Sequence, residues 1–130
     1  MLVLTIRSDN PEAEVGLYVN GKLLAYETWP AHRLLAETIH QKIQAMLKSQ
    51  GLDWSDIEGL VCFQGPGSFT GLRIGLSIGN SLSYGLSVPI VASQGKDWAK
   101  LGLQRLAAGQ NDQLAMPEYG APVHITKPKK

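Results

Sequence analysis

The chain has few residues of the kinds that mark secreted, membrane-spanning or nucleic-acid-wrapping proteins. Its single cysteine, Cys62, excludes an internal disulfide framework and fits a reducing compartment. Charged residues make up 18% of the chain and the formal net charge is +1, so the composition provides no broad basic surface for nucleic acid. The N-terminus lacks the basic start and long apolar run of a signal peptide. No stretch approaches the roughly 18 apolar residues that a membrane helix needs. We therefore expect a cytoplasmic protein without membrane contact.

The length and composition of the chain are those of one globular domain. The chain has 130 residues, of which 44% are hydrophobic, enough for a real core but not for two full lobes. From Gly109 onward, glycine, proline, polar residues and lysine replace the apolar pattern. We expect an α/β domain over residues 1–109 and an irregular C-terminal tail over residues 110–130.

Apolar patterns predict strands and helices in the order βββαβαβα. The strands are expected at residues 2–6, 13–19, 22–29, 60–63 and 88–92. The helices are expected at residues 31–50, from the end of the 65–71 loop to residue 84, and at residues 97–108. Asn20-Gly21 predicts a tight hairpin, and Gly51 and Gly85 are expected to end the first two helices. This order joins an antiparallel hairpin to parallel βαβ units in one five-stranded mixed sheet.

Residues 65–75 form the most informative segment, a glycine-rich turn from a strand into a helix. Its sequence is Gly-Pro-Gly-Ser-Phe-Thr-Gly-Leu-Arg-Ile-Gly. Glycines permit positive φ angles, and Ser68 or Thr70 can cap the helix. Backbone N–H groups at a helix start can instead hold an anion, but no Gly-Lys-Ser/Thr follows, so this is not a Walker A loop. Helix capping is the simpler interpretation.

The helix after this loop is apolar or glycine around an arc of roughly 200°, wider than one sheet needs. The arc runs through Ile74, Ile78, Leu82, Leu86, Gly71, Gly75, Gly79, Leu72 and Leu76. Its glycines, four residues apart, would let another backbone come close. We predict that the sheet covers this helix on one side and an intersubunit helix bundle covers it on the other. The alternative is that the third helix or the tail provides the second cover.

The segment 65–75 resembles the signature of the TsaB (YeaZ) family of tRNA threonylcarbamoyladenosine biosynthesis proteins. The likeness continues through Val88-Pro89-Ile90 and covers roughly residues 1–109. The resemblance implies an actin-like/RNase H-like (ASKHA) fold, of which we expect this chain to form a single lobe, because the second lobe of full-length members is replaced by the irregular tail. The resemblance also implies a non-catalytic subunit that binds the catalytic paralogue TsaD through a helical bundle and self-associates through the same surface. TsaE, an ATPase, is then a further partner, and tRNA an indirect one.

The resemblance places the partner interface on the two helices that begin near His32 and Leu72. The interface residues that we expect are Leu34, Thr38, Ala45, Leu72, Arg73, Leu76, Gly79, Asn80 and Ser83. The signature loop itself comprises Gly65, Pro66, Gly67, Ser68, Phe69, Thr70 and Gly71. We expect no catalytic residue and no metal ligand in this chain.

Two departures from the superfamily bear on activity. ATPases of the superfamily grip nucleotide between two lobes and carry an acidic residue after the first strand, where this chain has Arg7. The catalytic paralogue needs two histidines four residues apart, whereas His32 and His40 are eight apart. We expect no intrinsic cofactor, and the question of whether a nucleotide binds at the joint between subunits stays open. The alternative functions are a small nucleotide-binding or hydrolytic enzyme of the peptidase-labelled kind and a self-sufficient homodimeric regulator.

Overall fold

The computed structural model describes residues 1–31, 34–66 and 69–117, and it confirms the predicted order of strands and helices. The strands are β1 (Leu2–Arg7), β2 (Glu12–Val19), β3 (Lys22–Pro30), β4 (Gly59–Gly65) and β5 (Ile90–Gln94). The helices are α1 (Leu35–Ser49), the short 3₁₀ helix η2 (Trp54–Asp56), α2 (Phe69–Leu86) and α3 (Trp98–Ala107).

The five strands form one mixed sheet in the order β3-β2-β1-β4-β5. The strand β1 lies at its centre, antiparallel to β2 and parallel to β4, which is in turn parallel to β5. The hairpin between β2 and β3 turns at Asn20 and Gly21, whose φ angles are 51° and 83°. Positive φ at both positions matches the twist of the two strands, as the Asn-Gly dipeptide predicts.

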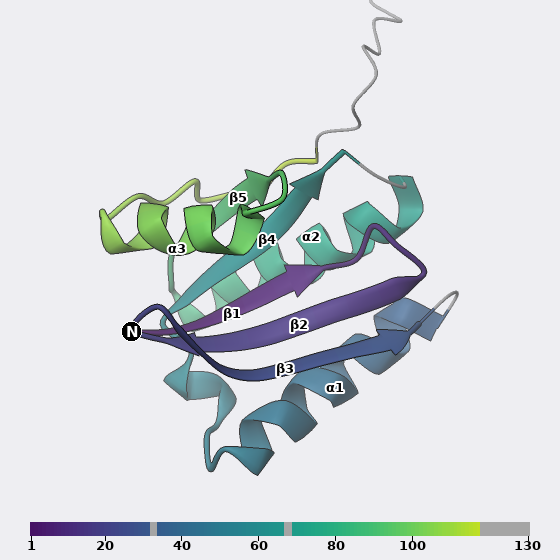
Figure 1. Cartoon of the computed structure of the whole chain (residues 1–130), viewed down its shortest axis with the longest axis horizontal. Coiled ribbons are helices and arrows are strands. Elements are labelled where there is room, and N and C mark those ends of the chain that lie inside the picture. The colour runs from purple at the N-terminus through teal and green to yellow at the C-terminus, as the bar shows by residue number, and fades with distance from the viewer. Residues whose placement is uncertain (32–33, 67–68, 118–130) are drawn as a thin grey trace, which may run out of the picture.

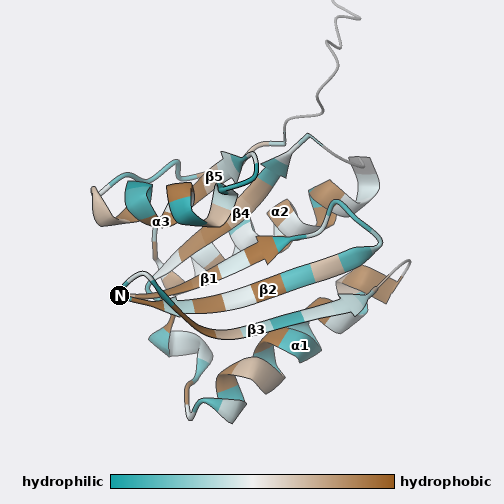
Figure 2. Ribbon diagram, in the orientation of Figure 1, coloured by the Kyte–Doolittle hydropathy of each residue, from teal (hydrophilic) through white to brown (hydrophobic). Residues whose placement is uncertain are grey.

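The helices cover the two faces of the sheet unequally. Helices α1 and α2 lie on one face, whereas α3 lies on the other, over β4 and β5 (Figure 1). The near side of β2 and β3 is free of helices in this view. Apolar residues accordingly concentrate along β1 and β4, which are buried on both faces (Figure 2).

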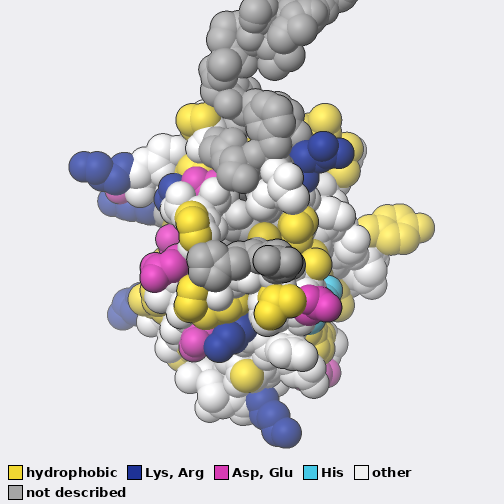
Figure 3. Space-filling model, turned by 90° about the vertical axis from the view of Figure 1, so that its right-hand side faces the viewer, with side chains coloured by type: hydrophobic (Ala, Val, Ile, Leu, Met, Phe, Trp, Pro, Cys, Tyr) yellow, Lys and Arg dark blue, Asp and Glu magenta, His cyan; other side chains and the backbone are white. Residues whose placement is uncertain are grey.

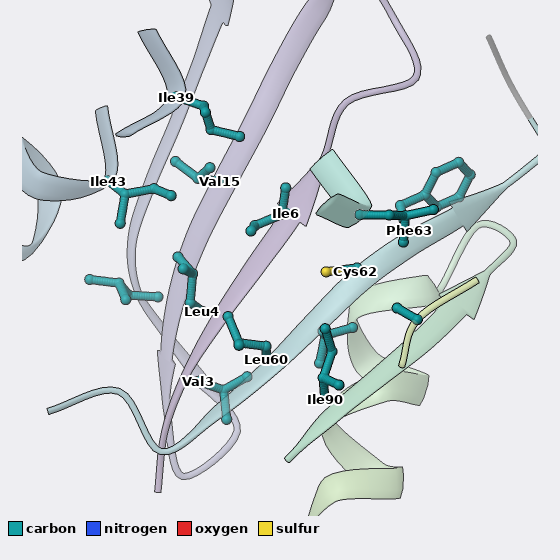
Figure 4. Packing of buried hydrophobic residues seen from close by; sticks show 14 of the residues in the cluster. Val3, Leu4, Ile6, Val15, Ile39, Ile43, Leu60, Cys62, Phe63 and Ile90 are labelled. Atoms are coloured by element: carbon teal, nitrogen blue, oxygen red, sulfur yellow. The ribbon is translucent and has the colours of Figure 1, made fainter. Parts of the chain in front are cut away.

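The main core fills the layer between the sheet and helices α1 and α2. Ile39 and Ile43 of α1 point toward Val15 of β2 (Figure 4). Leu4 and Leu60 continue the layer along β1 and β4, and each of these five side chains is at most 1% exposed. Burial of this apolar face fixes α1 on the sheet.

Two glycines allow α2 to lie unusually close to the sheet. A Cβ atom added at Gly79 would overlap the Sγ atom of Cys62 in β4. A Cβ atom at Gly75 would overlap the side chain of Ser8, just beyond β1. The structure thus assigns these glycines to close packing of the helix on its own sheet.

Residues 109–117 form no helix or strand, as predicted for the tail, but they pack on the domain. The Ile90 N–H donates to Asn111 Oδ1 at 3.1 Å, and the Asp112 N–H donates to the Ile90 carbonyl at 2.8 Å. The Ala92 N–H donates to Asp112 Oδ2 at 2.8 Å, and its carbonyl accepts from Arg105 at 2.9 Å. The outward backbone groups of Ile90 and Ala92 are therefore satisfied, which blocks the β5 edge of the sheet.

Two predicted helix boundaries are wrong. Helix α1 begins at Leu35 rather than at residue 31, because the Ala31 N–H bonds to the Pro11 carbonyl at 3.0 Å and extends the hairpin. Helix α2 passes through Gly85 and ends at Leu86, where Ser87 adopts a φ of 57°. No helix among the described residues is long and apolar enough to span a membrane.

A pair of substitutions in α2 tests the close contact with the sheet. We expect Gly79→Ala to lower the free energy of unfolding by about 1–3 kcal/mol, because the added methyl group overpacks against Cys62. Gly85→Ala is the matched control. Nothing lies near its added Cβ atom, so we expect a gain of about 0.5–1 kcal/mol from helix propensity. Urea denaturation measures both, and equal effects at the two positions would contradict the assignment.

Candidate partner-binding surface

A shallow groove of about 510 Å³ runs between α1 and α2 on the face away from the sheet. It is lined by Ala36, His40, Thr70, Arg73, Ile74, Ser77 and Ile78. Ile74 and Ile78 are partly buried and pack against the core, whereas Ala36, Arg73 and Ser77 are exposed. The groove thus has an apolar floor and a small or polar rim, the chemistry of a surface that takes another helix.

Helix α1 presents a different part of its surface to this groove than the sequence predicts. Thr38 is held against β3, since its hydroxyl accepts from Trp29 Nε1 at 2.9 Å and donates to the Leu34 carbonyl at 2.8 Å. Leu34, 53% exposed, and the exposed Ala45 do not line the groove. Ala36 and His40, one helical turn apart, line it in their place.

Helix α2 turns several of the predicted interface residues toward the inside of the chain. Leu72 and Leu76 are 0% and 4% exposed, and Gly79 lies on Cys62. Ser83 is buried, and its hydroxyl donates to the Val88 carbonyl at 2.6 Å. These four residues face their own domain, so the exposed residues of the groove are the ones available to a partner. A helical-wheel argument could have found Ile74 and Ile78 by assigning the glycine-rich side to the sheet.

The remaining two predicted residues, Arg73 and Asn80, lie on the accessible part of α2. Arg73 is exposed on the rim of the groove. Asn80 holds residue 115 of the C-terminal segment. Its Oδ1 accepts from the Ala115 N–H at 2.7 Å, and its Nδ2 donates to the Ala115 carbonyl at 3.0 Å. The C-terminal segment therefore covers part of the side of α2 that faces away from the sheet. This is the alternative to complete coverage by an intersubunit helix bundle.

An ion pair fixes the same segment to α3. Arg105 donates to the carboxylate of Asp112 through both terminal nitrogens. Partial burial acts to raise the pKa of Asp112, but the hydrogen bonds from Arg105 and the Ala92 N–H, with the guanidinium charge, lower it below its usual range.

The signature loop is described only in part. Gly65 ends β4 with a φ of 116°, and the Gly65–Pro66 peptide bond is cis. The Ser8 hydroxyl donates to the Gly71 carbonyl at 2.6 Å, which ties the first turn of α2 to the end of β1. Gly67 and Ser68 lie outside the described residues, and so do His32 and the tail beyond Pro117. The capping and anion-binding interpretations of Ser68 stay predictions.

At the carboxyl end of β1, the positive charge of Arg7 is paired with Asp9. The Arg7 guanidinium lies 3.9 Å from the centre of the Phe63 ring, and its Nε donates to Asp9 Oδ1 at 2.7 Å.

Burial raises the pKa of the Cys62 thiol to about 12, so this cysteine is protonated at neutral pH. Within residues 1–31, 34–66 and 69–117, no three His, Cys, Asp or Glu side chains gather as metal ligands would.

The face of the molecule at the right of Figure 1 has a mixed surface. Hydrophobic side chains lie there among both basic and acidic ones (Figure 3). Neither sign of charge forms a continuous field on this face, in keeping with the formal net charge of +1.

Sequence comparison relates the region that contains both helices to known proteins. The family model described as "TsaD: tRNA N6-adenosine threonylcarbamoyltransferase" matches residues 30–94, half of the chain. The "tRNA threonylcarbamoyladenosine biosynthesis protein TsaB" of Escherichia coli is 32% identical over 116 residues, covering 83% of this chain and 49% of that protein. The chain thus spans about half the length of this relative.

Structure comparison gives the same relationship and settles the fold. "YeaZ from Pseudomonas aeruginosa" superposes with a TM-score of 0.66 and 25% identity, over 72% of this chain and 43% of that one. The Thermus thermophilus RuvC structure in complex with a Holliday junction has a TM-score of 0.52 at 16% identity, over 96% and 85% of the two chains. At 16% identity, the likeness to RuvC supports the fold alone. The predicted actin-like/RNase H-like α/β fold is confirmed.

The lowered pKa of Asp112 predicts an acid-sensitive attachment of the C-terminal segment. A carboxyl group whose pKa is lower in the folded state stabilises that state above its unfolded pKa, and the contribution is lost as pH falls through the folded value. We expect Asp112→Asn to melt at a lower temperature than the wild type at pH 7, and this difference to shrink below about pH 4.

Thermal melts followed by circular dichroism at several pH values measure this effect. Glu37→Gln, which removes an exposed carboxylate of α1, is the control. If the deficit of Asp112→Asn were the same at pH 3 and pH 7, the ion pair with Arg105 would not be its source.

Proposed function

The chain belongs to the TsaB (YeaZ) family, and from that membership we propose that it is a non-catalytic partner subunit in the formation of N6-threonylcarbamoyladenosine on tRNA. In this role it docks on the catalytic TsaD subunit and stabilises the arrangement in which that subunit acts. The observation that carries the proposal is the groove between α1 and α2, with its apolar floor of Ile74 and Ile78.

The family match supports TsaD as the occupant of this groove. The TsaD family model matches the segment that contains α1, β4, α2 and β5, so TsaD has a related helix pair. Two related surfaces can pack about a pseudo-twofold axis, each helix pair against the other. The exposed Ala36 and Ser77 are small enough for helices to approach closely, and Ile74 and Ile78 would be covered between them.

The side chains near the strand ends support a role without catalysis. Arg7 carries a positive charge where ATPases of this superfamily have an acidic residue, and it is already paired with Asp9. Cys62 is buried and protonated, which argues against a nucleophile. A nucleotide-binding or hydrolytic enzyme of the peptidase-labelled kind is the competing function. Measurable ATP turnover or proteolysis by the isolated chain would revive it.

Further members of the complex follow from the same proposal. A TsaE-type ATPase would join the pair, and tRNA would be held mainly by other subunits, because the formal net charge of this chain is only +1. In the absence of TsaD, the same groove would pair two copies of this chain. Light scattering with and without TsaD distinguishes the homodimer from the mixed complex.

Substitutions at exposed groove residues test the docking without disturbing the core. We expect Ala36→Arg combined with Ser77→Arg to weaken TsaD binding by at least about tenfold, because two long cationic side chains would obstruct the groove. Calorimetric titration of the TsaD from the same organism measures the affinity.

Ala107→Arg is the matched control, since Ala107 is an exposed alanine of α3, on the opposite face of the sheet. It should leave TsaD binding unchanged. A wild-type chain that fails to bind TsaD, or a double variant that binds it normally, would end the proposal. Substitutions at Leu76 or Gly79 are poor tests, because both residues pack inside the domain.

A further inference from the structure

A second groove of about 530 Å³ lies on α2 beside the first, between this helix and the C-terminal segment. Helix α2 contributes Arg73, Ser77, Asn80 and Tyr84, among others, and the opposite wall is residues 114–117. Tyr84, Leu114 and Met116 are 89%, 56% and 57% exposed. Three of the large apolar side chains that the described structure leaves open to water thus surround one groove.

The second groove is continuous with the first. Arg73 and Ser77 line both, so a single surface crosses α2 from Ala36 on one side to Met116 on the other. A partner that covers Arg73 and Ser77 from the first groove therefore also lies at the border of the second, whose far wall is residues 114–117.

The C-terminal wall is held in place before any partner arrives. Both hydrogen bonds of the Asn80 amide go to the backbone of Ala115, which is 2% exposed. Gln64 Nε2 donates to the Met116 carbonyl at 3.0 Å. These bonds bury Ala115 while the side chains on either side of it, Leu114 and Met116, stay outside. Such pre-organisation reduces the entropy that a docking surface loses on binding.

We propose that residues 114–117 form the far edge of the partner-docking surface, so that the TsaD-type subunit covers Tyr84, Leu114 and Met116 when it occupies the α1–α2 groove. This inference rests on the proposed function and extends it to a segment outside the helix pair. Continuity through Arg73 and Ser77 identifies the occupant as the subunit already placed on the first groove. Asn80 is then a positioning residue, which acts by fixing the backbone of Ala115.

The first experiment compares two double substitutions of exposed apolar residues in the full chain. Leu114→Ser with Met116→Ser should weaken TsaD binding by at least about tenfold, because apolar area at an interface is lost. Leu23→Ser with Leu24→Ser is the control. These leucines of β3 are 55% and 41% exposed but line neither groove, so TsaD binding should not change.

The second experiment uses hydrogen exchange and does not depend on a variant of the exposed residues. Addition of TsaD should slow amide exchange at residues 114–116 of the wild-type chain. In the free chain, Asn80→Ala should speed exchange of the Ala115 amide and also weaken TsaD binding, because the wall is no longer held.

The outcomes separate this inference from the proposed function. If Leu114→Ser with Met116→Ser binds TsaD normally while Ala36→Arg with Ser77→Arg does not, the extension is wrong and the docking proposal stands. If the serine pair only dissociates a homodimer, the wall belongs to contact with a second copy, and the inference is again overturned. If the wild-type chain does not bind TsaD, both fall.

Discussion

The close packing of α2 on the sheet determines what this protein can present to a partner. Gly75 and Gly79 remove the side chains that would otherwise separate the helix from Ser8 and Cys62. One side of the helix thereby packs inside the domain. The same packing buries Cys62, and burial raises the pKa of its thiol. The residues that remain outside, above all Ile74 and Ile78, become the apolar floor of a groove with α1. Every functional proposal for this chain depends on that division of the helix into two sides.

Outside the helix pair, the end of β1 and the edge of β5 are both occupied by contacts within the chain. Arg7 occupies the carboxyl end of the central strand together with Asp9 and Phe63, which leaves a paired cation where an acid would serve nucleotide chemistry. Asn111 and Asp112 extend from the last helix to β5, and from there the chain reaches Asn80. These contacts are compatible with the association surface proposed for the helix pair.

Much of the fold could be predicted from the sequence, because hydrophobic periodicity, Asn20-Gly21 and the glycine-rich turn are local signals. The two boundaries that failed have different causes. The Ala31 N–H is bonded to the distant Pro11 carbonyl, which no local pattern shows, whereas α2 continues through Gly85 and ends only before Ser87, which adopts a positive φ. The two helices expected to form the interface are present, but Leu72, Leu76, Gly79 and Ser83 of α2 face their own domain. Glycine spacing shows that something approaches α2 closely, yet the sequence does not say whether it is a neighbour or the chain's own strand. Asn80 and Ala115 are 35 residues apart, and no local pattern connects them.

The bonds along β5 have a consequence for the solution behaviour of the chain. A strand at the rim of a sheet is a template on which other chains can assemble, and here the side chains of Asn111, Asp112 and Arg105 occupy the template of β5. Proteolytic clipping after α3 would uncover it, and the shortened protein would become prone to edge-to-edge aggregation even with its hydrophobic interior intact. Asn111 and Asp112 thus shield the edge of the sheet from pairing with other chains.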